Sequence, residues 1–240
     1  MYVDLVKYIY ESTSLPIQNR VPGERVLYAI SHRGPRVLSA PPPDLLSVKL
    51  VRSCRKLALM WHAADQALLA EAAFYSNSVQ EAPALTGPDA MAVYYHLESF
   101  VLFSRSALDI ASYVFGWMLP APFPNDRYDS FHRLLNALAR HKEAFPEITP
   151  ILASRDNPKG WVPILVGEER GRCLRDKLAH QTEFPIDYED LPFTEKRHAV
   201  VRLSDQVCFA LPEFLNVVRD GVLDGFHRLE KSVPRGSVHT

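Results

Sequence analysis

The sequence has little of several features that would place it in a specialised class. Its three cysteines are odd in number and far apart, and no C-x-x-C pair indicates a zinc or redox site, so we expect a reducing compartment. Glycine is scarce, with 10 residues in 240, which excludes a collagen-like or low-complexity chain. The formal net charge of −1 excludes a strongly basic nucleic-acid-binding protein, although a local basic patch is still allowed.

Long uninterrupted hydrophobic runs and the common catalytic motifs are also missing. The most apolar stretch, about 93–119, contains Glu98, Arg105 and Asp109, so we expect no membrane span. Charges also interrupt residues 1–14, which therefore lack the form of a secretory signal, and a cytoplasmic location is expected. No phosphate-binding loop, dinucleotide fingerprint, zinc-protease pair or nucleophile elbow is present, so we expect no cofactor and no metal.

What is present is a globular composition with helical patterning. Hydrophobic residues make up 47% and charged residues 23%, and a chain of this length buries about 70–75% of its unfolded surface. Short β-branched runs near 25–39 and 184–203 predict minor strands, the first as a small hairpin. The fold class predicted is all-α, an up-and-down helical bundle with minor β pieces. Apolar residues recur at helical spacing over about 44–77, 89–118, 126–143, 161–180 and 204–231, the last bent at Pro212.

Proline and turn signals divide the chain into three parts. Three consecutive prolines form a stiff spacer just before Asp44, a good helix N-cap. We therefore predict an N-terminal appendage over 1–43 and a helical bundle over 44–231. The remaining residues, 232–240, are predicted to be a flexible tail.

One segment near the end of the 161–180 helix combines an arginine, an acid and a histidine. Arg175 is followed directly by Asp176, and His180 lies five residues after the arginine. Spacing alone decides nothing, because other Arg–His pairs have similar separations. Only this pair has an acid directly after the arginine at the end of an apolar-faced helix. The similar pairs are Arg25–His32, Arg55–His62 and Arg127–His132.

Helix geometry separates the three residues into two groups. Asp176 and His180 are i and i+4 neighbours, so the carboxylate can accept the imidazole N–H, fix its tautomer and raise its pKa. Arg175 lies about 140° around the helix from His180, so a shared site needs the reach of arginine, a loosened last turn or a second subunit. The alternative is a helix-end charge pair with a histidine favoured by the helix dipole.

The stretch HLESFVLFSRSALD at 96–109, a helical spacer and then RDKLAH at 175–180 resemble the HEPN family (higher eukaryotes and prokaryotes nucleotide-binding). The resemblance covers about residues 90–182. It implies a homodimer in which two motif helices form one composite cleft. It also implies a metal-independent endoribonuclease, in which His180 handles the proton of the ribose 2′-OH or of the leaving oxygen and Arg175 stabilises charge on the phosphate.

Two function classes follow from the resemblance, and a third stands beside them. The first is an endoribonuclease acting as a toxin or defence effector, with RNA as substrate and an antitoxin protein as partner. The second is a non-catalytic HEPN-like module that binds a nucleotide, RNA or a protein. The third is an unrelated helical scaffold protein, in which the motif is only a charged helix end.

A second polar constellation lies on the apolar 89–118 helix. Arg105 and Asp109 lie seven and eleven residues after Glu98, which places all three on one stripe of the helix surface. They are either an exposed charge stripe or a buried polar network facing the motif helix. In the second case Asp109 or Glu98 would position Arg175, since a buried arginine requires a partner.

Overall fold

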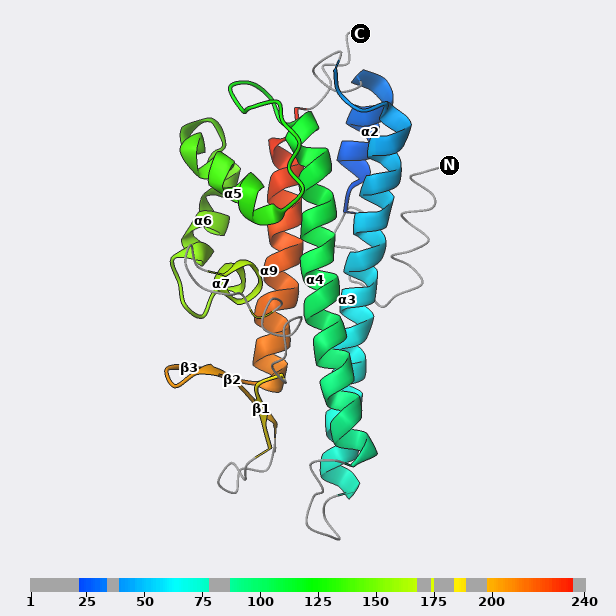
Figure 1. Ribbon diagram of the computed structural model, residues 1–240, viewed down its shortest axis with the longest axis vertical. Coiled ribbons are helices and arrows are strands. Elements are labelled where there is room, and N and C mark those ends of the chain that lie inside the picture. Colours follow the sequence, from blue (N-terminus) through cyan, green and yellow to red (C-terminus); the bar gives the residue numbers. More distant parts are fainter. Residues whose placement is uncertain are drawn as a thin grey trace.

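Long helices and one small sheet make up the protein, as Figure 1 shows. The computed structural model describes residues 22–33, 39–77, 87–167, 174, 184–188 and 198–234. The predicted all-α class with minor β pieces is confirmed. Of the helices in the described residues, none is both long enough and apolar enough to cross a membrane. The long helices are α3 (Pro43–Asn77), α4 (Pro88–Met118) and α9 (Leu211–Ser232), and the shorter α2 (Glu24–Arg33) precedes them.

Helices α3 and α4 form one long hairpin that organises the fold (Figure 1). Their inner faces are apolar and fully buried, as the helical spacing of Leu50, Leu57, Phe100 and Leu108 predicts. Ser53 Oγ on α3 donates a hydrogen bond of 2.7 Å to the backbone carbonyl of Ala107 on α4. The small side chains at these two positions allow the two helices to approach closely. Helix α9 packs against both helices and completes the core.

The first helix corrects one expectation. The strand hairpin predicted near 25–39 is wrong for its first half, because Glu24–Arg33 is α2. Its start is stabilised from the other end of the chain. Glu230 on α9 accepts the backbone N–H groups of Gly23 and Arg25, at 3.3 and 2.8 Å. A carboxylate placed there satisfies orphan donors of a helix N-terminus, which sequence periodicity does not reveal.

Short helices cover one side of the hairpin. Helix α5 is shorter than the predicted 126–143, because Ser130 accepts the N–H of Arg133 and caps a helix that begins at Phe131. A bend through two 3₁₀ turns then leads to α6, and a turn closed at Gly160 leads to α7. The elements are α5 (Phe131–Arg140), η1 (Lys142–Ala144), η2 (Pro146–Ile148), α6 (Thr149–Arg155) and α7 (Trp161–Val166).

The helix predicted over 161–180 does not continue unbroken. Helix α7 ends at Val166, and Gly167 has a φ of 83°, with its N–H bonded to the carbonyl of Pro163. A positive φ favours glycine and commonly ends a helix, so the chain turns at this point. Leu174 is helical and buried.

The strands lie where the second β-branched run predicted them, and they extend further. The antiparallel sheet has the order β1 (Ile186–Asp187), β2 (Val200–Ser204) and β3 (Val207–Ala210). The predicted helix start at Ser204 is therefore wrong, because Val207 to Ala210 pairs with β2 instead. Pro212 does not bend α9. It lies in the first turn, where its missing N–H costs nothing.

Candidate functional site

The motif residues Arg175, Asp176 and His180 lie outside the described residues. Their roles and the homodimer therefore stay predictions. The structure describes Leu174, the residue directly before Arg175, and Leu174 is buried, with 6% of its surface exposed.

Helix α7, which leads into this segment, is held in place by a large aromatic contact. The indole of Trp161 lies over two glycines of α9, Gly221 and Gly225, and its ring centroid is 5.8 Å from that of Phe131. A Cβ built on Gly221 would lie 2.2 Å from the indole, so glycine is needed for this approach. The position of α7 is thus determined by shape as well as by burial.

A polar contact also holds the end of α7, and it comes from the predicted stripe on α4. Arg105 Nε donates to Asp109 Oδ2 at 2.9 Å, and Arg105 Nη1 donates to the carbonyl of Leu165 in α7 at 3.3 Å. Asp109 Oδ1 accepts the backbone N–H of Phe131, at the start of α5, at 2.8 Å. Two side chains of α4 therefore bind the start of α5 and the end of α7.

The pair of Arg105 and Asp109 is neither the fully exposed charge stripe nor the fully buried network that the sequence allowed. The side chain of Arg105 is 12% exposed and that of Asp109 is 29% exposed, so the pair is partly buried rather than free in solvent. A third member was expected, but Glu98 is half-buried and makes no ion pair or hydrogen bond with other described residues. The structure therefore joins Arg105 and Asp109 and leaves Glu98 apart from them.

A second buried acid escaped the sequence analysis. Glu71 on α3 accepts the backbone N–H of Ala199 at 2.7 Å, and the other carboxylate oxygen lies 3.0 Å from His198 Nδ1. Burial raises the pKa of Glu71, against the opposing effect of these hydrogen bonds. The histidine side chain is 34% exposed and that of Glu71 is 4% exposed, so the carboxylate orients an imidazole that reaches solvent.

This pair has the form of a carboxylate-oriented histidine, which can accept or donate a proton. Its surroundings include Tyr188, which donates to the carbonyl of Ala90 and whose pKa is raised by burial. The one sequence signal for a buried Glu71 is its place on the apolar face of α3, four residues after the buried Ala67. Its partner lies 127 residues away, where no pattern could have found it.

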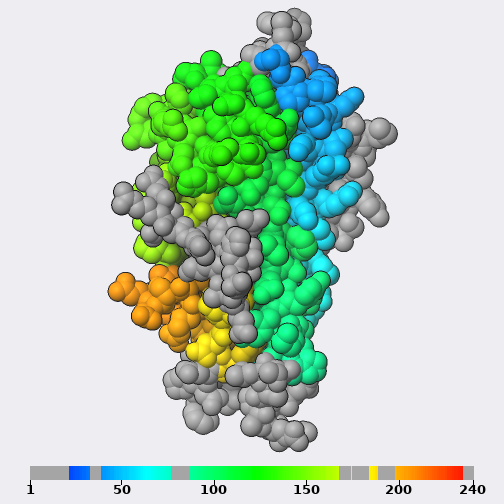
Figure 2. Space-filling model, viewed as in Figure 1, coloured from blue at the N-terminus to red at the C-terminus, as the bar shows by residue number. Residues whose placement is uncertain are grey.

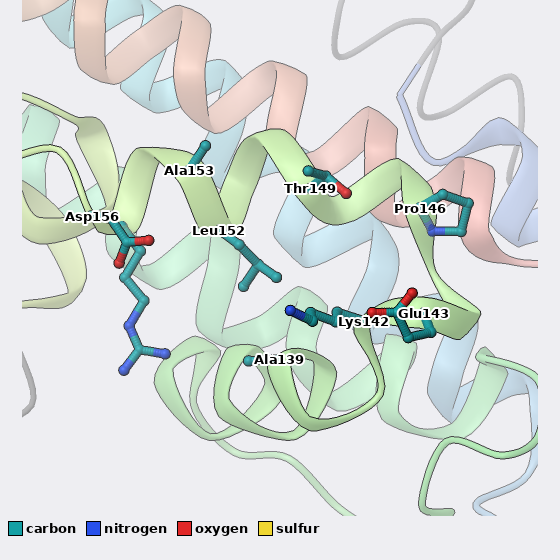
Figure 3. A pocket seen from close by; sticks show the side chains of 9 residues that line it. Ala139, Lys142, Glu143, Pro146, Thr149, Leu152, Ala153 and Asp156 are labelled. Carbon is teal, nitrogen blue, oxygen red and sulfur yellow. The ribbon is translucent and has the colours of Figure 1, made fainter.

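Metal and small-molecule sites are weakly supported. No group of three or more histidine, cysteine or acidic side chains is arranged for a metal within the described ranges. One groove lies between α5 and α6 (Figure 3). Its lining includes Lys142 and Glu143 from η1, Leu152 and Arg155 from α6, and Asp156 just after α6, so charges of both signs border it. It offers no reactive group beyond these charges.

The assignment of a function rests on residues and geometry. No protein-family model matches the sequence, and neither a curated protein nor a solved structure does. The resemblance to HEPN proteins accordingly stays an expectation carried by the two motif stretches.

Proposed function

We propose that the protein is a cytoplasmic, metal-independent endoribonuclease of the HEPN type, acting as a homodimer and serving as a toxin or defence effector. Arg175, Asp176 and His180 are the proposed catalytic residues. The observation that supports this most is the double anchoring of α7, the element that leads into the motif. Arg105, a proposed supporting residue that is paired with Asp109, binds the end of α7 through the carbonyl of Leu165, and Trp161 anchors the start of the same helix.

The proposed reaction is a transesterification. One His180 imidazole accepts the proton of a ribose 2′-OH, and that oxygen attacks the adjacent phosphorus. The bond from phosphorus to the 5′-oxygen breaks, and this oxygen takes a proton from the His180 of the second subunit. Arg175 stabilises the charge that develops on the phosphate oxygens. The products are a 2′,3′-cyclic phosphate and a 5′-hydroxyl.

The first prediction concerns cleavage without metal. Purified protein is incubated with mixed RNA in EDTA, and cleavage is expected to persist. His180→Ala should lower the rate about 10²–10⁴-fold, the usual contribution of positioned acid–base catalysis. Arg175→Lys should restore only part of what Arg175→Ala loses, because lysine lacks the planar fork. Asp176→Asn should move the histidine limb of the pH–rate profile to lower pH, since the charge that raises its pKa is gone.

The matched control is His132→Ala, which removes a histidine at the same distance from an arginine. His132 bonds to Asn136 on α5, outside the proposed site, so the rate should not change. Full activity in the double variant Arg175→Ala, His180→Ala would remove the ribonuclease proposal.

A second candidate is a non-catalytic HEPN-like module that binds a nucleotide, RNA or a protein. The near-neutral net charge of −1 favours it, because an RNA-cutting surface needs cationic contacts. The same assay separates the two candidates, since this module would bind RNA, shift it on a gel and leave its length unchanged.

A further inference from the structure

The stretch of α3 from Lys49 to Lys56 carries positive charge and no acid. Between Asp44 and Asp65 the helix contains four cationic residues and no acid. No carboxylate among the described residues forms an ion pair with any of the four. Such a run contrasts with the net charge of −1, so the protein concentrates cations here and compensates for them elsewhere. The four are Lys49, Arg52, Arg55 and Lys56.

Aromatic rings on α4 lie beside two of these cations. Lys49 Nζ is 4.8 Å from the centroid of the Tyr113 ring, and Lys56 Nζ is 4.7 Å from that of Phe103. Arg127, in the segment after α4, places its guanidinium carbon 5.6 Å from the same Tyr113 centroid. Cation–π contacts of this kind hold the charges at the surface without neutralising them.

Two like charges therefore converge on one ring. Lys49 and Arg127 lie within about 10 Å of each other, because both distances are measured to the Tyr113 centroid. Asp126 is the neighbouring acid, and its carboxylate accepts the backbone N–H of Arg127. The local balance stays positive, which favours an anionic partner. We call Lys49, Arg52, Lys56, Phe103, Tyr113 and Arg127 the basic–aromatic surface.

We propose that the basic–aromatic surface binds single-stranded RNA through its phosphates. Lys49, Arg52 and Lys56 follow one another at i, i+3 and i+7, so they share a face and span about 10 Å along the helix axis. About three phosphates of one stacked strand, at 3.4 Å each, match that length. The rings of Phe103 and Tyr113 are partly buried and lie beneath these cations, so they hold the charged side chains in place to meet phosphates. The choice of RNA over DNA rests on the proposed function.

The surface lies away from α7, on the α3 side of the hairpin. Figure 2 shows α3 and α4 side by side along this part of the molecule. Arg105 and Asp109 bind α7 and α5, and none of the residues of the basic–aromatic surface takes part in these bonds. Binding by this surface therefore does not require an active motif, and it can be measured in a protein that does not cut.

The second prediction is tested with the full chain carrying His180→Ala, so that the probe stays intact. Anisotropy of a labelled 12-nucleotide oligouridine is measured between 50 and 200 mM KCl. The triple variant Lys49→Gln, Arg52→Gln, Lys56→Gln should weaken binding about tenfold or more and reduce the slope of log K against log salt by about 2, since each single-strand phosphate contact contributes about 0.7.

The control variant removes the same charge elsewhere, with Arg133→Gln, Arg202→Gln and Arg228→Gln. These arginines are paired with Asp129 before α5, Asp187 of β1 and Asp224 of α9, and their loss should leave the slope unchanged. Equal losses in both triple variants would overturn the proposal, as would an unchanged slope in the first. Binding of phosphatidylserine vesicles in place of RNA would overturn it too. Binding that persists while the protein with His180 intact fails to cleave refutes only the proposed function.

Discussion

The two flanks of α4 carry similar residues and use them differently. Towards α5 and α7, Arg105 is paired with Asp109, and both also bind backbone groups of the next elements. Towards α3, Lys49 and Lys56 lie over aromatic rings and have no acidic partner in the described part of the chain. The first flank uses its charges to join elements, and the second leaves them available to a partner.

The difference between the two flanks indicates which charged residues contribute to the stability of the fold. A charge pair that also satisfies backbone groups of other elements is costly to lose, because each remaining group is left unsatisfied. A lysine at the surface over a partly buried ring contributes little to stability, and its charge can be removed without harm to the fold. Substitutions on the two flanks should therefore separate stability from binding.

The largest expected loss follows from Asp109→Ala. The variant leaves Arg105 without its acid and the N–H of Phe131 without its acceptor, so unfolding free energy should fall by about 3 kcal/mol. Asp109→Asn, which keeps an oxygen for that N–H, should lose about half as much. Urea unfolding measures both. A loss below 0.5 kcal/mol for the alanine variant, on the order of an exposed pair, would contradict the comparison.

A smaller loss is expected from Gly221→Ala. Alanine gains about 1 kcal/mol in helix propensity over glycine, but its Cβ would lie 2.2 Å from Trp161, so we expect a net loss of about 2 kcal/mol. The neighbouring Asp220→Ala is the control and should change stability by less than about 0.5 kcal/mol. Adding Trp161→Leu should recover part of the loss. A stabilised Gly221→Ala protein would show that the indole does not determine the place of α7.

The smallest effect is expected from Lys56→Gln. The contact of Lys56 with Phe103 is a single cation–π pair, so unfolding free energy should change by about 0.5 kcal/mol or less. The same variant should still lower RNA affinity and reduce the salt slope by about 0.7. A stability loss of 2 kcal/mol in this variant would mean that the α3 flank is structural as well.

The long helices could be predicted because their apolar periodicity reflects local geometry. Pro43–Asn77 and Pro88–Met118 agree with the predicted 44–77 and 89–118 within one residue at each end. The predictions that were wrong concern elements whose partners are distant in the sequence or form only in the folded sheet. The start of α2 is satisfied by Glu230, some 205 residues away, and β3 exists because β2 is there to pair with it.

The candidate site divides in the same way. The contact of Arg105 with Asp109 follows from their i, i+4 spacing, which is local helix geometry that the sequence contains. Their bonds to Leu165 and Phe131 did not follow, because these are backbone groups that any residue supplies. The convergence of Lys49 and Arg127 on Tyr113 was equally invisible, since three segments must meet to create it.

The clasp between Glu230 and the start of α2 brings together residues that stand near opposite ends of the sequence. Arg25 also reaches the backbone carbonyl of Val233 just after α9, so the first and last described helices meet at one place. Because the first and last described helices adjoin, a short linker could connect them, and a new start of the chain could be placed in an exposed turn such as Asn157–Lys159. A circular permutant of this kind should keep the fold, because the packing of the helices does not depend on which of them comes first in the chain.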